Sequence, residues 1–310
     1  GTYDMRELNV CHTVSLAGAG EAETIIEGTV AGLRGGARIS HVTVRHGIAG
    51  GIQVSPGHDA EIVRCTITEN ASAILAGAGI RCLADSRPVI RNCTITSNRV
   101  NRAGGGIYCG LRSSPLIADC IIQGNSTVEE IGRYGGGIYV DLDASPAVTN
   151  CIISGNRAPA GAGVYCGRES RPTLRNCTIG GNPCYRSWDT SEVYAEFSFL
   201  AMVNCIVWGA ALPSLVERVD GDSRLIVGRS CIASAEPWPG DRNINLDPLF
   251  IDPGRWDDRG TPDDPRDDVW IPGDYRLRSG SPAIDAGASE GAPAADIEGN
   301  TRPCWDAIDM

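Results

Sequence analysis

Two acidic residues and one arginine are the strongest candidates for catalysis in this chain. Asp141 and Glu196 each follow a tyrosine by two residues, in corresponding places of two similar segments. If the segments stack as parallel strands, about 4.8 Å apart, the two carboxyl groups lie about 10 Å apart. That separation is at the upper end of what an inverting glycosidase needs for its acid and base, and Arg168 would add a guanidinium group. The alternative is that both carboxylates are solvated groups on turns.

A second set of residues has the character of a carbohydrate-binding surface. Tyrosines occupy the middle of short apolar runs, where the flanking Ile, Val and Cys are expected to point inward and the tyrosines outward. These are Tyr108, Tyr139, Tyr165 and Tyr194, and Arg81 takes the same place earlier in the chain. Aromatic rings with a polar tip suit sugar binding at low entropic cost. The alternative is a tyrosine row that only stabilises the fold by stacking between neighbouring strands.

Two irregular segments accompany this row. The longest insertion, residues 126–134, carries Arg133 and Tyr134, and a second irregular stretch, residues 183–189, carries Trp188. Loops that project from a rigid scaffold usually carry recognition. We therefore expect Arg133, Tyr134 and Trp188 to wall the surface that the tyrosines define.

The Asp-rich stretch at residues 257–268 is a candidate cation site. Asp257, Asp258, Asp263 and Asp264 would supply the carboxylate oxygens that Ca²⁺ prefers. Their spacing matches no EF-hand, so the alternative is a solvated loop that nearby arginines partly neutralise. Ca²⁺ is the single cofactor that the sequence indicates.

A repeated sequence pattern indicates which secondary-structure elements position these residues. Cysteines recur at intervals of 26–31 residues, and each is followed five residues later by an asparagine; they are Cys65, Cys93, Cys120, Cys151 and Cys177. A period in this range indicates a solenoid. The apolar runs are short and rich in β-branched residues, which favours strands, while Asn and Gly clusters fit the turns between them. The prediction is an all-β fold: a right-handed parallel β-helix, built as a single-stranded solenoid.

Most of the 13 cysteines are predicted to be buried thiols. Nine of them recur in equivalent inward-pointing places, where Cys acts as a small apolar residue. Cys11, Cys184 and Cys304 lie outside these rows, and any disulfide is expected to include one of them.

The repeated pattern Asn-Cys-Thr-Ile, Asn, Gly-Gly-Gly-Ile-Tyr and Ser-Pro resembles that of secreted bacterial right-handed β-helix repeat proteins, which share the architecture of pectate lyases. The runs Asp-Pro-Leu-Phe at 247–250 and Ser-Pro-Ala-Ile-Asp-Ala-Gly at 281–287 are similar to the C-terminal cap of the same group. The resemblance implies a secreted or cell-surface protein. We expect an N-terminal first coil at residues 1–36, β-helix repeats at 37–246 and an irregular C-terminal capping region at 247–310.

The amino-acid composition limits the classes of molecule that the protein is expected to bind. The net charge is −11 and the chain contains no lysine, which disfavours nucleic acids and anionic membrane surfaces. No apolar stretch is long enough for a membrane-spanning helix, so membrane insertion is not expected. Polysaccharide remains the favoured partner, and other subunits of a surface assembly are an alternative one.

Three functions are compatible with these observations. The first is binding of a polysaccharide along the exposed tyrosines. The second is a polysaccharide-degrading enzyme, either a glycoside hydrolase or a lyase, that uses the acidic residues beside them; the motifs of polygalacturonase-like hydrolases are absent, and a lysine base is impossible. The third is a structural rod in an extracellular assembly, in which the tyrosines serve stacking alone.

Overall fold

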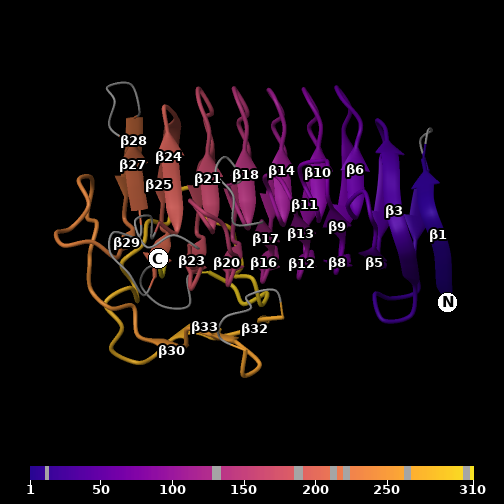
Figure 1. Cartoon of the computed structure of the whole chain (residues 1–310). Coiled ribbons are helices and arrows are strands. Elements are labelled where there is room, and N and C mark those ends of the chain that lie inside the picture. The colour runs from indigo at the N-terminus through magenta and orange to yellow at the C-terminus, as the bar shows by residue number, and fades with distance from the viewer. Residues whose placement is uncertain are drawn as a thin grey trace.

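The computed structural model describes residues 1–10, 14–127, 134–184, 191–209, 215–218, 224–261, 267–302 and 308–310. All regular elements within these ranges are β-strands, and the strands stack coil upon coil along one axis (Figure 1). The predicted all-β parallel β-helix is therefore confirmed. None of the described residues forms a helix with the length and apolarity that a membrane crossing needs.

One face of the solenoid, here called the tyrosine face, carries the predicted tyrosine row. Its strands are β6 (Ile52–Val54), β10 (Ile80–Cys82), β14 (Ile107–Cys109), β18 (Ile138–Val140), β21 (Val164–Cys166), β24 (Val193–Glu196) and β27 (Leu215–Arg218). Tyr108, Tyr139, Tyr165 and Tyr194 lie side by side in successive strands. In the three-residue strands β6, β10, β14, β18 and β21, the first and third residues point into the core, so the middle residue points outward.

The second face begins after a proline in several coils. Its strands are β2 (Ser15–Ala17), β4 (Ala37–Ser40), β7 (Ala60–Val63), β11 (Val89–Arg91), β15 (Leu116–Ala118), β19 (Ala147–Thr149), β22 (Thr173–Arg175), β25 (Phe199–Val203) and β28 (Arg224–Gly228). Pro88, Pro115 and Pro146 directly precede or lie next to strand starts, where the missing N–H costs no ladder bond.

The third face completes each coil. Its strands are β1 (Thr2–Asn9), β5 (Thr43–His46), β8 (Thr66–Thr68), β12 (Thr94–Thr96), β16 (Ile121–Gln123), β20 (Ile152–Ser154), β23 (Thr178–Gly180), β26 (Ile206–Trp208) and β29 (Cys231–Ile232). Strand β3 (Ile25–Leu33) pairs with both β5 and β6 and so contributes to two faces. The short strands β9 (Ala71–Ser72), β13 (Arg99–Val100) and β17 (Ser126–Thr127) continue the coil beyond this face.

Equivalent residues stack in rows inside the coils. The isoleucines Ile67, Ile95, Ile122, Ile153 and Ile179 form one fully buried row. Burial of each such side chain contributes roughly 1.5–3 kcal/mol. The repeat cysteines are buried thiols, as predicted, and donate to backbone carbonyls; Cys93 Sγ, for example, lies 3.4 Å from the Ile62 oxygen. Burial raises the pKa of Cys82 and of Cys166 to about 12, so these thiols act as apolar core groups.

Buried asparagines form a second row, here called the asparagine ladder, at the corner after the third face. It consists of Asn70, Asn98, Asn125, Asn156 and Asn182. In the first four, Nδ2 donates to the Oδ1 of the next coil's asparagine, at 2.8–3.0 Å; Asn182 donates to Glu192 instead. Each also donates to a backbone carbonyl of the coil before it, for instance Asn98 to Ile67 at 2.9 Å. Every coil is therefore tied to both neighbours by satisfied buried amides.

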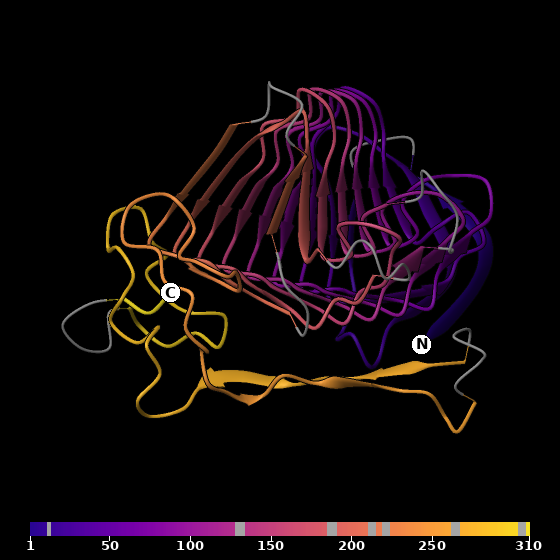
Figure 2. The same cartoon turned by 60° about the vertical axis from the view of Figure 1, so that its left-hand side comes forward.

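The C-terminal region forms a long hairpin that lies along the third face (Figure 2). It pairs β30 (Phe250–Asp252) with β33 (Asp274–Leu277), and β31 (Arg255–Asp257) with β32 (Val269–Ile271), both antiparallel. Tyr275 donates its hydroxyl to the Pro253 carbonyl at 2.9 Å. Further along, Asn204 and Ala288 exchange two hydrogen bonds. This region thus covers the side of the last coils, in addition to any role at the end of the stack.

Candidate functional site

The four tyrosines of the tyrosine face stack on one another. Ring centroids are 5.7 Å apart for Tyr108 and Tyr139, 5.3 Å for Tyr139 and Tyr165, and 5.4 Å for Tyr165 and Tyr194, with interplanar angles of 9° or less. Because the rings lie parallel at the strand spacing, the faces of the inner rings contact other rings. Their edges and hydroxyls are left as the groups that a ligand can reach.

Tyr165 corrects the expectation that every tyrosine in this row is exposed. Its exposed fraction is 3%. Tyr139 and Tyr194 cover its two sides in the row, and Tyr134 stacks on it at 4.6 Å between ring centroids. The structure therefore does bring Tyr134, from the long insertion, against the tyrosine row. Arg133 and Trp188 lie outside the described residues.

The two predicted catalytic carboxylates lie two strands apart, as the repeat implied. Each accepts a hydrogen bond from the tyrosine of the preceding strand on this face: Tyr108 donates to Asp141, and Tyr165 donates to Glu196. Burial, reinforced by the carboxylate, raises the pKa of both tyrosines well above the usual range. Both phenols therefore stay protonated and act as donors.

Arg168 and Arg81 have other partners. The Arg168 guanidinium lies over the Phe197 ring, 4.5 Å from its centroid. Arg81 continues the tyrosine row next to Tyr108 and donates to Gln53 of the preceding coil. Its Nε is buried and has no hydrogen-bond partner within the described part of the chain.

The hydroxyl of Tyr139 differs from those of Tyr108 and Tyr165. Its ring lies between theirs, but no residue that the structure describes accepts or donates a hydrogen bond at this hydroxyl. On the strand next to Tyr139, the position equivalent to Asp141 and Glu196 is Gly167, which has no side chain. A Cβ at Gly167 would lie 3.8 Å from the Tyr139 hydroxyl oxygen. Among the described residues, the two hydroxyl–carboxylate pairs therefore flank a tyrosine hydroxyl that forms no such pair.

Two of the four predicted calcium ligands cap turns. Asp257 accepts the backbone N–H of Arg259 at 3.0 Å, and Asp258 accepts that of Gly260 at 2.9 Å. Asp263 and Asp264 lie outside the described residues. Among the residues that are described, no three His, Cys, Asp or Glu side chains are arranged to hold a metal ion. The calcium site stays a prediction.

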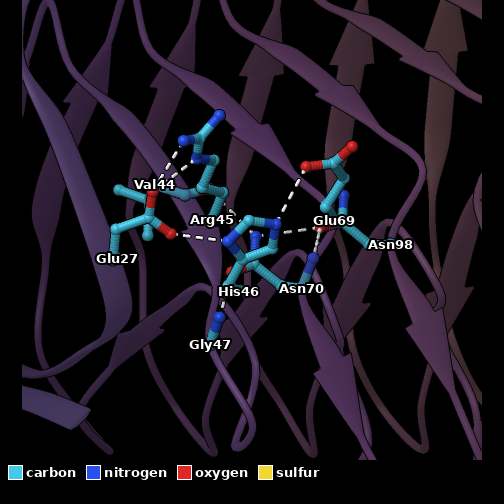
Figure 3. Close-up of polar contacts among 8 residues, drawn as sticks. All are labelled: Glu27, Val44, Arg45, His46, Gly47, Glu69, Asn70 and Asn98. Carbon is cyan, nitrogen blue, oxygen red and sulfur yellow. Dashed lines mark hydrogen bonds and ion pairs between the residues drawn. The ribbon is translucent and has the colours of Figure 1, made fainter. Parts of the chain in front are cut away.

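A charged cluster on the first coils was not predicted. His46 Nδ1 lies 2.5 Å from Glu27 and its Nε2 lies 3.1 Å from Glu69, so both contacts are hydrogen bonds only in the imidazolium form (Figure 3). Arg45 Nε lies 2.8 Å from Glu27, and this guanidinium, followed by His46, lowers the pKa of the Glu27 carboxyl. His46 ends strand β5 with φ 57°. Its two acidic partners come from neighbouring coils and show no spacing signal.

A cavity of about 630 Å³ between the hairpin and the third face was also missed. It is lined by Glu192 and by the indoles of Trp208, Trp256 and Trp270. Glu192 is 2% exposed and takes the Nδ2 hydrogen bond of Asn182 at 2.6 Å. The repeat offered an indirect signal, because the position that should hold the next ladder asparagine is Ala210.

Parallel coils with stacked internal side chains define a class of protein, the parallel β-helices. The family model described as "Right handed beta helix region" matches residues 29–200. This is more than half of the chain, and the protein belongs to that family. No curated protein and no solved structure matches the chain. The family accounts for the coil and its handedness, and a fold of this kind is shared by proteins of unrelated function.

Proposed function

We propose that this protein is a secreted or cell-surface β-helix that binds polysaccharide along the tyrosine face. The observation that carries the proposal is the alternation of hydroxyls and carboxylates along this face, with the unoccupied Tyr139 hydroxyl between the Tyr108–Asp141 and Tyr165–Glu196 pairs. The two pairs recur every second strand, about 10 Å apart by strand spacing. This is the scale of a disaccharide unit in an extended glycan.

The stacked rings define how such a ligand is held. Since the inner ring faces contact other tyrosines, the glycan lies across ring edges and exchanges hydrogen bonds with hydroxyls and carboxylates. The stack adds rigidity, so little side-chain entropy is lost on binding. An acidic face favours a neutral or amino-bearing polysaccharide over a sulfated or uronic one.

The hydrolase alternative rests on Asp141 and Glu196. Both acids accept phenol hydrogen bonds, and a general acid must instead hold a proton for the leaving oxygen. Binding is therefore the function that this geometry supports better. Release of reducing ends from a bound glycan would favour the hydrolase, and absence of both binding and turnover would favour a structural rod.

The test uses Tyr139→Phe, which removes one hydroxyl and keeps the ring stack. Affinity gel electrophoresis on neutral and acidic polysaccharides should show a two- to tenfold loss of affinity, as expected for about 0.5–1.5 kcal/mol of one hydrogen bond. Tyr3→Phe, at an exposed tyrosine far from this face, is the control. If wild-type protein binds and Tyr139→Phe binds equally well, the ligand does not lie on the tyrosine face.

A further inference from the structure

The cavity beneath the hairpin has apolar walls and one deeply buried acid. Its lining includes the rings of Trp208, Phe250, Trp256 and Trp270, together with Glu192. Trp270 is held in place by the third face: a Cβ on Gly155 would lie 2.0 Å from the Trp270 ring. A volume of about 630 Å³ is in the range of pockets that hold small organic molecules.

Glu192 occupies the end of the asparagine ladder. Asn182 donates to its carboxylate with Nδ2 at 2.6 Å and with its backbone N–H at 3.1 Å. These donors are uncharged, and within the described residues the carboxylate forms no ion pair. A buried carboxylate without a counter-ion is costly. Within the described residues, the Glu192 carboxylate therefore has no cationic partner.

Two of the indoles that line the same cavity have unused donors. Nε1 of Trp256 and Nε1 of Trp270 are buried and lack hydrogen-bond partners among the residues described. The Arg157 guanidinium already lies over Trp256, 3.7 Å from the ring centroid, and pairs with Asp268. A tryptophan in this corner thus already binds a cation on one face.

We propose that this cavity binds a small organic ammonium ion, whose charge pairs with Glu192 and whose carbon atoms lie against the indoles. A diffuse cation suits walls of this kind, because a hard metal ion needs more oxygen ligands than Glu192 and Asp247 provide. Arg255 and Arg278 also line the cavity, and Arg278 donates to the Ile251 carbonyl. An anion would still be repelled by the buried Glu192 carboxylate. An alcohol or ether oxygen on the ligand would also satisfy an indole N–H.

The proposal predicts a pH dependence. The other titratable groups around the cavity are Asp247, Arg255, Arg278 and Cys184, with Tyr275 on the adjoining strand. Burial raises the pKa of Glu192 to about 7, whereas the arginines keep their charge in this range. The carboxylate form binds the cation, so affinity should fall about tenfold from pH 8 to pH 6.

The experiment is isothermal titration calorimetry of the whole chain with choline and with its neutral isostere 3,3-dimethyl-1-butanol at pH 8. Choline should bind at least tenfold more tightly than the isostere. Glu192→Gln, which keeps an acceptor for Asn182, should abolish this preference. Glu236→Gln, at an exposed acid outside the cavity, should retain it.

Three results would overturn the proposal: no choline binding by the wild type, equal binding of choline and the isostere, or an unchanged preference in Glu192→Gln. The pH titration of wild-type protein needs no variant, so a failure of Glu192→Gln to fold would still leave the proposal open to refutation. Affinity that does not fall between pH 8 and pH 6 would count against it.

Discussion

The corner after the third face differs between the first and last coils. In the first coils this position holds His46, Glu69 and Ser97; in later coils it holds the glycines Gly124, Gly155 and Gly181. All six residues have similar backbone conformations, with φ between 54° and 68°. The glycines are therefore not required by backbone conformation, since three other residue types adopt it here. They are required by what lies outside the coil.

The hairpin explains the difference. Trp270 lies over the glycine corners, where a Cβ would approach it to 3.2 Å at Gly124, 2.0 Å at Gly155 and 2.9 Å at Gly181. In the part of the chain that the structure describes, the hairpin does not cover His46 and Glu69, and their side chains form the charged cluster on the surface (Figure 3). One repeat position thus serves as a docking surface in one half and as a polar surface in the other.

The largest expected effect comes from giving the covered corner the residue of the uncovered one. Gly155→Ser introduces the side chain that Ser97 carries at a similar positive φ. It adds the usual cost of a side chain in this conformation, and the added atoms collide with Trp270. Overpacking together with lost Trp burial should cost about 4 kcal/mol. Urea unfolding would measure the loss, and limited proteolysis of the hairpin would rise.

Gly124→Ser is the matched control, because it has a similar positive φ and its Cβ would lie 3.2 Å from the Trp270 Cβ and at ordinary contact distance from Thr96 and Ser97. It should cost less than 1 kcal/mol, since a small shift relieves the contact. Equal losses in the two variants would show that the hairpin does not depend on the Gly155 contact.

The second effect tests how well the hairpin excludes water. Burial raises the pKa of Glu192 from its ordinary value of 4.5 to about 7. Between these values the folded protein binds more protons than the unfolded one, so stability is highest below about pH 4.5 and falls as pH rises to about 7. The loss attributable to this residue is up to about 3 kcal/mol.

Unfolding by urea at pH 5 and pH 8 would measure this dependence, and Glu192→Gln should remove it while Glu236→Gln keeps it. In Gly155→Ser the dependence should also shrink, because undocking of the hairpin rehydrates the cavity. A wild-type profile identical to that of Glu192→Gln would show that Glu192 is already solvated.

Repeated residues were predictable from the sequence and single contacts were not. The outward tyrosines, the corner asparagines and the inward cysteines each recur with the coil, so one period places all of them. Glu192 takes the place of a glycine that precedes the strand in the earlier coils, such as Gly137 and Gly163. That departure from the repeat is visible in the sequence, but nothing in it points to the bond with Asn182. The Arg157–Asp268 pair joins residues 111 apart in sequence, and neither residue shows a spacing that points to the other. The charge cluster at His46 likewise depends on which neighbours happen to be acidic.

The asparagine ladder offers the smallest effect and the sharpest comparison, because it runs beneath both kinds of corner. Asn98 and Asn156 are each 0% exposed and make equivalent bonds to the next asparagine, at 2.9 Å and 2.8 Å. Replacing either by Ala leaves buried donors and acceptors unsatisfied, at a cost of about 2 kcal/mol. If docking of the hairpin depends only on the corner side chains, Asn98→Ala and Asn156→Ala should lose equal stability in urea unfolding. Asn101→Ala, outside the ladder, should lose little. A much larger loss for Asn156→Ala would mean that the hairpin also depends on the ladder inside the coil, and that the two halves differ within the solenoid as well as on its surface.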